Sequence, residues 1–124
     1  PYVILKTLAG ESPQMTSGVR RVDWIYVDDV VSALLRMADA PAIDGMTIEI
    51  GSGSSLTVEE IVRLTMGMID PAVEPKFGSV KDRPMEQERN ADVEQTYARI
   101  GWRPQIDIRT GLRRTIDYYA GLAG

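Results

Sequence analysis

Hydrophobic and polar positions follow strand patterns and helix patterns in alternation along this chain of 124 residues. Residues 22–27 are mostly β-branched or aromatic, which favours a strand. Residues 46–50 alternate between apolar and polar side chains, as a half-buried strand does, and residues 73–77 are compatible with a third, short strand. Helical patterns lie between and after these segments. Strands that alternate with helices predict an α/β fold.

The first two predicted helices depend mainly on the spacing of apolar residues. A helix over residues 2–9 ends at Gly10, although its β-branched residues also permit a strand. A second helix follows the strand at 22–27, and either Asp28 or Asp29 can cap it. We expect one buried stripe on this helix, made of Val30, Val31, Leu34, Leu35 and Ala38.

The clearest helix start lies at Thr57. Thr57-Val58-Glu59-Glu60 is a capping box, in which a hydroxyl and a carboxylate reciprocally satisfy free backbone amides, and the helix is expected to end at Asp70-Pro71. Its inner face is expected to carry Val58, Ile61, Val62, Thr65 and Ile69.

Two closing helices are predicted in the last third of the chain. Asp92 caps a short helix that stops at Gly101, and the last helix runs from about Ile108. The charged stretch 78–90 before them is predicted to be a loop, and loops of that length in a compact domain are usually functional or mobile.

Composition and charge narrow the class of protein. With 44% hydrophobic and 26% charged residues, the composition is that of an ordinary soluble domain. A chain of this length can bury enough surface to form one core, so we expect a single domain over residues 1–124. The net charge of -4, without a basic cluster, argues against nucleic acid or an anionic membrane as a partner. No apolar run is long enough to cross a bilayer and no secretion signal is visible, so we expect a cytoplasmic protein.

Cysteine and histidine are both absent from the sequence. Disulfides, thiolate nucleophiles, histidine-based triads and zinc sites are therefore excluded. Tyr2 and Lys6 have the spacing of a catalytic Tyr-x-x-x-Lys pair, but no hydroxyl partner or cofactor-binding turn precedes them. We therefore assign no catalytic residue and no metal-binding residue to this chain.

Two further patterns allow either a functional or a purely structural interpretation. The turn Gly51-Ser52-Gly53 precedes a helix and could hold phosphate, but no third glycine or Gly-Lys-Ser/Thr ending completes a nucleotide-binding motif, so a simple turn is the alternative. Arg83 in the long loop and Arg20 and Arg21 in the earlier one could converge on a sugar diphosphate, because guanidinium groups pair with phosphate in a bidentate way. Solvated surface charge is the alternative there.

Several segments together resemble the carboxyl-terminal part of NAD-dependent sugar-nucleotide epimerases and dehydratases, in the extended short-chain dehydrogenase/reductase family. Residues 22–30, Val-Asp-Trp-Ile-Tyr-Val-Asp-Asp-Val, are similar to the family's Arg-Asp-aromatic-Ile-Tyr/His-Val-x-Asp element. Residues 45–53 with the Thr57 capping box resemble its late strand, turn and helix. Arg83-Pro84, Ala91-Asp92 and residues 100–104 resemble its final loop and closing helices. The resemblance implies a partial Rossmann-like chain that lacks the dinucleotide-binding half.

The resemblance also implies roles for individual residues. Arg83 matches the family's arginine that binds the substrate diphosphate, and Glu86 falls where the family often has an acidic contact to the nucleotide ribose. The family's other arginine directly precedes Asp23, but this chain has Val22 there. Either a loop shift lets Arg21 serve, or that phosphate contact is absent.

We therefore expect the substrate-side portion of an NAD-dependent epimerase or dehydratase, with a nucleotide sugar as its ligand. The family's cofactor turn and catalytic Tyr/Lys region are missing, so this chain alone is expected to bind no cofactor, while NAD is implied for the parent family. One alternative is a stand-alone module that binds a ligand or associates with itself, since apolar strands without a cofactor domain tend to be covered by a partner such as a homodimer. Another is an enzyme that is completed by a separately encoded chain.

Overall fold

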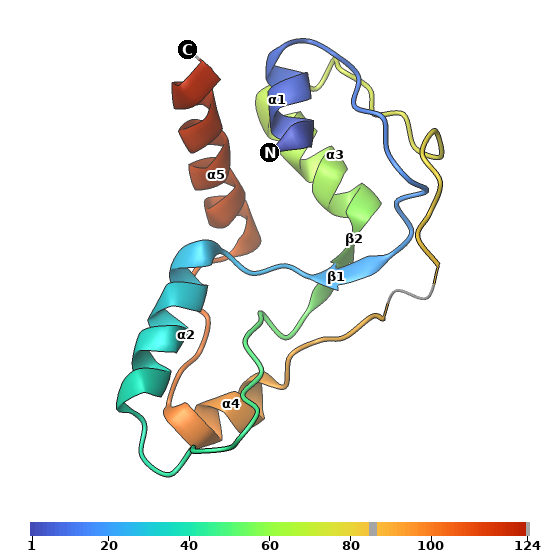
Figure 1. Ribbon diagram of the computed structural model, residues 1–124. Coiled ribbons are helices and arrows are strands. Elements are labelled where there is room, and N and C mark those ends of the chain that lie inside the picture. Colours follow the sequence, from blue (N-terminus) through green and yellow to red (C-terminus); the bar gives the residue numbers. More distant parts are fainter. Residues whose placement is uncertain (85–86, 124) are drawn as a thin grey trace. The chain divides into compact units, whose positions relative to one another are not determined.

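The computed structural model describes residues 1–84 and 87–123. Within this part the chain forms five helices and a two-stranded sheet in which β1 lies next to β2 (Figure 1). In chain order the elements are α1 (Tyr2–Leu8), β1 (Arg21–Asp23), α2 (Val27–Asp39), β2 (Ser55–Thr57), α3 (Val58–Ile69), α4 (Val93–Ile100) and α5 (Ile108–Ala123). The expected α/β class is confirmed.

The chain divides into two compact units. The first comprises Pro1–Val22, Leu56–Glu88 and Leu112–Gly124, and the second comprises Asp23–Ser55 and Arg89–Gly111. Each unit combines segments that are far apart in the sequence. The single domain expected over residues 1–124 stays a prediction.

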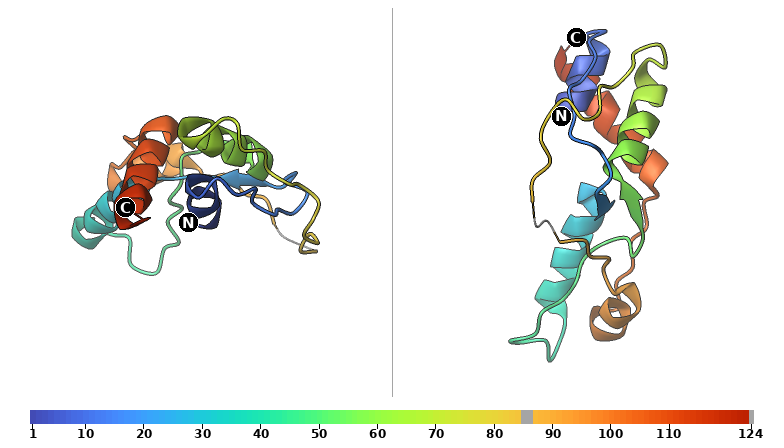
Figure 2. Two further views of the ribbon diagram at one scale, coloured as in Figure 1. Left: turned by 90° about the horizontal axis from the view of Figure 1, so that it is seen from above. Right: turned by 90° about the vertical axis from the view of Figure 1, so that its right-hand side faces the viewer.

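Helices supply most of the buried side chains of the first unit. Helix α1 packs against α3, and the left view of Figure 2 shows both helices from above. The capping box is present: the Thr57 hydroxyl accepts a hydrogen bond from the Glu60 amide, and the Glu60 carboxylate accepts one from the Thr57 amide. The buried hydrophobic residues of this unit are Ile4, Ile61, Val62, Met66 and Ile116. The inner face predicted for residues 57–69 is thus largely confirmed.

The core of the second unit is built around Trp102. Ala33, Ile100 and Trp102 are buried together, and Ile48 and Ile50 pack against them. The Trp102 indole N–H donates a hydrogen bond of 2.9 Å to the Ser32 hydroxyl, so its polar atom is satisfied. Helix α4 begins at the Asp92 cap and ends at Gly101, whose φ of 67° is left-handed, as its sequence predicts.

Two predicted strands are absent from the described residues, and a third is shorter than expected. Residues 46–50 form no strand, and in 73–77 only Lys76 makes a bridge, to Gln14. The strand predicted over 22–27 is confined to Arg21–Asp23. Alternation predicts which side chains are buried, but a strand also needs a neighbouring strand to share its hydrogen bonds. Residues 46–50 partly bury Ile48 and Ile50 without such a neighbour.

Helix α2 differs from its prediction in two ways. It begins at Val27 without a side-chain cap, because Asp28 and Asp29 lie inside its first turn. The expected stripe is also largely exposed, including Val31, Leu34 and Leu35 at 48%, 54% and 66%. The buried positions are Asp29 and Ala33, so the helix turns a different face toward the core. No helix in the described ranges is long and apolar enough to span a membrane.

Candidate functional site

A cavity of about 420 Å³ lies in the first unit, where the loop before β1 meets the loop after α3. Eight residues line it: Thr16, Ser17, Val19, Arg20, Val58, Asp82, Arg83 and Glu88. The predicted site residue Arg83 is therefore beside a cavity, together with a second arginine from a distant part of the sequence. Two guanidinium groups and two carboxylates give this cavity a mixed charge.

Backbone pairing holds the two loops together along one side of the cavity. The Lys76 amide donates to the Pro13 carbonyl at 3.0 Å, the Gly78 amide to Thr16 at 2.9 Å, and the Val80 amide to the Met15 carbonyl at 3.1 Å. These bonds place the residues after Val80 next to Ser17. The long loop predicted over 78–90 is thus fixed at its first residues.

Two carboxylates, one on each side of Arg83 in the sequence, attach this loop to the earlier one at further points. Asp82 Oδ1 accepts a hydrogen bond of 2.9 Å from the Ser17 amide, and Glu88 Oε1 accepts one of 3.0 Å from the Arg21 amide. Hydrogen bonds from the Ser17 side chain and amide hold the pKa of Asp82 below its usual range. Asp82 is therefore ionised at neutral pH and acts as an acceptor there.

Arg20 and Arg21 are consecutive, yet of these two only Arg20 is among the residues that line the cavity. The charge of Arg21 acts instead on Glu60, whose pKa is lowered first by the Thr57 amide and, among smaller causes, by Arg21. Both arginines lie within two residues of Val22, the position of the family's arginine, so proximity in the sequence alone does not decide between them.

The remaining predicted site residue, Glu86, lies outside the described residues. Sequence reasoning did not select Asp82 and Glu88, which flank Arg83 in the structure. In the sequence, Asp82 and Glu88 are carboxylates that lie within a few residues of Arg83, one on each side. Which backbone amides these carboxylates reach depends on the tertiary fold.

The glycine turn of the second unit is occupied by a side chain of the protein itself. Asp23 accepts hydrogen bonds from the amides of Ser52 and Gly53 at 2.8 and 3.0 Å, from the Ser52 hydroxyl at 2.5 Å, and from the Ala91 amide at 2.9 Å. A Cβ at Gly51 would lie 2.6 Å from Asp23 Oδ2. Because the turn's amides already bind a carboxylate, they do not fit the role of a cradle for the phosphates of a dinucleotide such as NAD.

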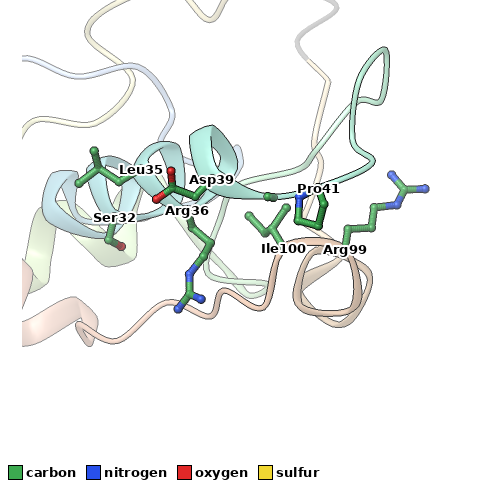
Figure 3. A pocket seen from close by; sticks show the side chains of 8 residues that line it. Ser32, Leu35, Arg36, Asp39, Pro41, Arg99 and Ile100 are labelled. Carbon is green, nitrogen blue, oxygen red and sulfur yellow. The ribbon is translucent and has the colours of Figure 1, made fainter.

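A second cavity, of about 470 Å³, lies in the second unit and also contains two arginines, Arg36 and Arg99. Figure 3 shows that their side chains point away from each other. The Arg99 guanidinium donates a 3.0 Å hydrogen bond to the Thr47 carbonyl. This cavity therefore does not present two guanidinium groups to one ligand.

Tyr2 and Lys6 have structural partners. The Tyr2 hydroxyl accepts a hydrogen bond from the Gln14 amide at 3.1 Å, and the Lys6 ammonium forms an ion pair with Glu11. The hydrogen bond and the charge of Glu11 raise the pKa of Lys6 above its ordinary value. A raised pKa keeps Lys6 protonated, and its ammonium faces Glu11, so the pair remains without a catalytic assignment.

Comparison with known proteins agrees with the family resemblance of the sequence segments quoted above. The family described as the NAD dependent epimerase/dehydratase family matches residues 1–51. The chain is 32% identical to dTDP-glucose 4,6-dehydratase 1 of Escherichia coli over 128 residues, which cover 96% of the chain and 35% of that protein. It is 29% identical to UDP-glucose 4-epimerase of Mycolicibacterium smegmatis over 99 residues, which cover 78% of the chain and 30% of that protein.

A solved structure agrees in fold. UDP-glucose 4-epimerase of Thermotoga maritima, determined with UDP-glucose, matches with a TM-score of 0.82 and 25% identity, over 98% of this chain and 39% of that one. The chain thus spans about a third of the length of the curated relatives it matches. Sequence and fold lead to the same conclusion: this chain belongs to the NAD-dependent epimerase/dehydratase family.

Proposed function

We propose that this chain is the substrate-side portion of a nucleotide-sugar epimerase or dehydratase, and that it binds the diphosphate of the nucleotide sugar. The observation that carries the proposal is the placement of Arg20 and Arg83, from loops more than sixty residues apart in the sequence, on one cavity. Guanidinium groups bind phosphate oxygens in a bidentate way and keep their charge at all physiological pH values. The similar Thermotoga maritima epimerase was determined with UDP-glucose, a ligand of this class.

The proposal assigns this chain a binding role and leaves the redox chemistry elsewhere. A diphosphate held by Arg20 and Arg83 would fix one end of the substrate and orient the sugar toward a reacting centre. NAD would supply that centre with a hydride acceptor. We propose that NAD is bound outside this chain, since Asp23 occupies the amides of the glycine turn.

Arg21 and Glu86 remain in the proposal as secondary contacts. The Arg21 side chain is outside the set that lines the cavity, and the family resemblance is what supports a diphosphate contact for it. Glu86 is proposed as an acceptor for the ribose hydroxyls on the same basis. Arg20 is added to the proposed diphosphate contacts because it lines the same cavity as Arg83.

Calorimetric titration of the chain tests the proposal. UDP-glucose, a GDP-sugar and a dTDP-sugar are titrated into the wild-type chain and into Arg20→Ala and Arg83→Ala. Each substitution is expected to weaken binding about tenfold or more, because a charge-assisted hydrogen bond contributes roughly 1.5–3 kcal/mol. Arg109→Ala is the matched control, since Arg109 is an exposed arginine of the second unit. Equal affinities of all variants, or no binding to any sugar nucleotide, would contradict the proposal.

A self-associating module is the second candidate function, and one feature of α2 favours it. Val27, Val31, Leu34 and Leu35 follow each other at helical spacing and are 48–66% exposed. Exposed apolar stripes of this kind are commonly covered by another protein surface, and a second copy of the chain is one such cover. Sedimentation equilibrium of wild type and Leu35→Glu tests it, and a concentration-independent monomer mass for the wild type would exclude it.

A further inference from the structure

The residue immediately before Arg83 is the nearest point at which its loop is attached. Within residues 1–84 and 87–123, no hydrogen bond or ion pair holds the Arg83 guanidinium. Asp82, in contrast, is bound to the Ser17 amide at 2.9 Å and lines the same cavity. We propose that Asp82 is a positioning residue that sets Arg83 opposite Arg20, an inference that rests on the proposed binding of a diphosphate at this cavity.

The order of contacts along the loop supports this assignment. Backbone pairing ends with the Val80 amide bonded to Met15, and Asp82 makes the next contact. Among the described residues, the following attachment is at Glu88, six residues further along. The described contact nearest to Arg83 is therefore that of Asp82, one residue away. Without the bond between Asp82 and Ser17, the last described attachment before Arg83 would be at Val80, three residues away.

Charge alone predicts the opposite effect for removal of the Asp82 carboxylate, which makes the positioning role testable. A carboxylate beside an anion site repels the anion, so loss of the Asp82 charge should strengthen anion binding if charge were all that mattered. Positioning predicts that loss of the hydrogen bond weakens binding, because ordering a free loop and a long side chain costs binding energy. Asparagine separates the two effects, since its side-chain oxygen can accept from the Ser17 amide without a negative charge.

The experiment compares Asp82→Ala with Asp82→Asn in titrations with inorganic pyrophosphate and with UDP-glucose. We expect Asp82→Ala to weaken binding of both ligands about tenfold and Asp82→Asn to bind as tightly as wild type or more tightly. Hydrogen exchange of the Ser17 amide provides a readout without ligand: Asp82→Ala is expected to accelerate it and Asp82→Asn to retain its protection. This readout also checks that the substitution acts at the loop.

The outcomes separate this inference from the proposed function. If Arg83→Ala weakens binding but Asp82→Ala binds as well as wild type or better, the diphosphate site stands and the positioning role is overturned. Equal weakening in Asp82→Ala and Asp82→Asn also overturns it, because the retained hydrogen bond would then have no effect. If neither ligand binds the wild type, or Arg83→Ala has no effect, the proposed function and this inference fail together.

Discussion

Replacement of Asp23 by alanine is expected to destabilise the second unit more than any exposed substitution. Its carboxylate accepts four hydrogen bonds, from the amides of Ser52, Gly53 and Ala91 and from the Ser52 hydroxyl. An unsatisfied buried donor costs roughly 1–3 kcal/mol, and these donors are only partly buried, so water recovers some of the loss. We expect Asp23→Ala to lower the free energy of unfolding by about 3 kcal/mol.

Urea unfolding monitored by tryptophan fluorescence measures this loss. Both tryptophans, Trp24 and Trp102, lie in the second unit, so the signal reports the part of the chain that the substitution affects. Asp39→Ala is the matched control: it removes the same charge from an exposed position at the end of α2 and is expected to change stability by less than about 0.5 kcal/mol. An effect of Asp23→Ala no larger than that of the control would refute the structural role given to this carboxylate.

The pH dependence of the same difference provides a second readout. Burial alone raises the pKa of Asp23, but the hydrogen bonds from the Ser52 hydroxyl and the three amides outweigh it, so the pKa lies below its usual value. A carboxyl whose pKa falls on folding stabilises fully above its unfolded pKa of about 3.9 and loses this contribution as the pH falls through the folded pKa. The difference between wild type and Asp23→Ala should therefore be constant above about pH 5 and shrink below about pH 4. A difference independent of pH down to pH 2 would contradict the linkage.

Four further substitutions test other contacts: Gly51→Ala and Asp29→Ala, in the second unit, by the same fluorescence assay, and Gly67→Ala and Thr57→Ala, in the first unit, by thermal unfolding with circular dichroism. Gly51→Ala places a Cβ 2.6 Å from Asp23 Oδ2 and is expected to cost about 1–3 kcal/mol, whereas Gly67→Ala in α3 meets nothing within 4 Å and should stabilise by about 1 kcal/mol; equal effects would contradict the close approach. Asp29→Ala removes a buried acceptor for two backbone amides, at 2.9–3.1 Å, and should cost about 2–4 kcal/mol, so a loss under about 1 kcal/mol would argue against its structural role. Thr57→Ala removes the hydroxyl of the capping box and should cost about 1 kcal/mol, measured by thermal unfolding with circular dichroism, and an unchanged melting temperature would be the contrary result.

Features that depend on neighbouring residues were predictable from the sequence. The capping box at Thr57, the Asp92 cap and the stop at Gly101 were located correctly, because each requires residues only a few positions apart. The two unformed strands were not predicted correctly, because pairing needs a partner strand that local pattern does not specify. Helix α2 was misjudged in the same way: apolar residues line more than one of its faces, and only tertiary packing selects the buried one.

The candidate site was predictable in part. Arg83 was selected from the sequence, and it lines the cavity. Arg20 lines the cavity as well, although proximity to Asp23 in the sequence favours Arg21. Asp29 was read as a helix cap, whereas its carboxylate binds the amides of Gln105 and Ile106, more than seventy residues away. Contacts over that distance are set by the completed fold and leave no local pattern.

The division of roles between Arg20, which lines the cavity, and Arg21, whose charge helps to lower the pKa of Glu60, makes the length of the chain before β1 as consequential as its composition. Insertion of one residue between Gly18 and Arg20 would change the register between these two guanidinium groups and the loop of Arg83 while every existing side chain in the segment remained the same. Variants of altered length would therefore reveal a constraint that substitution scanning alone does not detect.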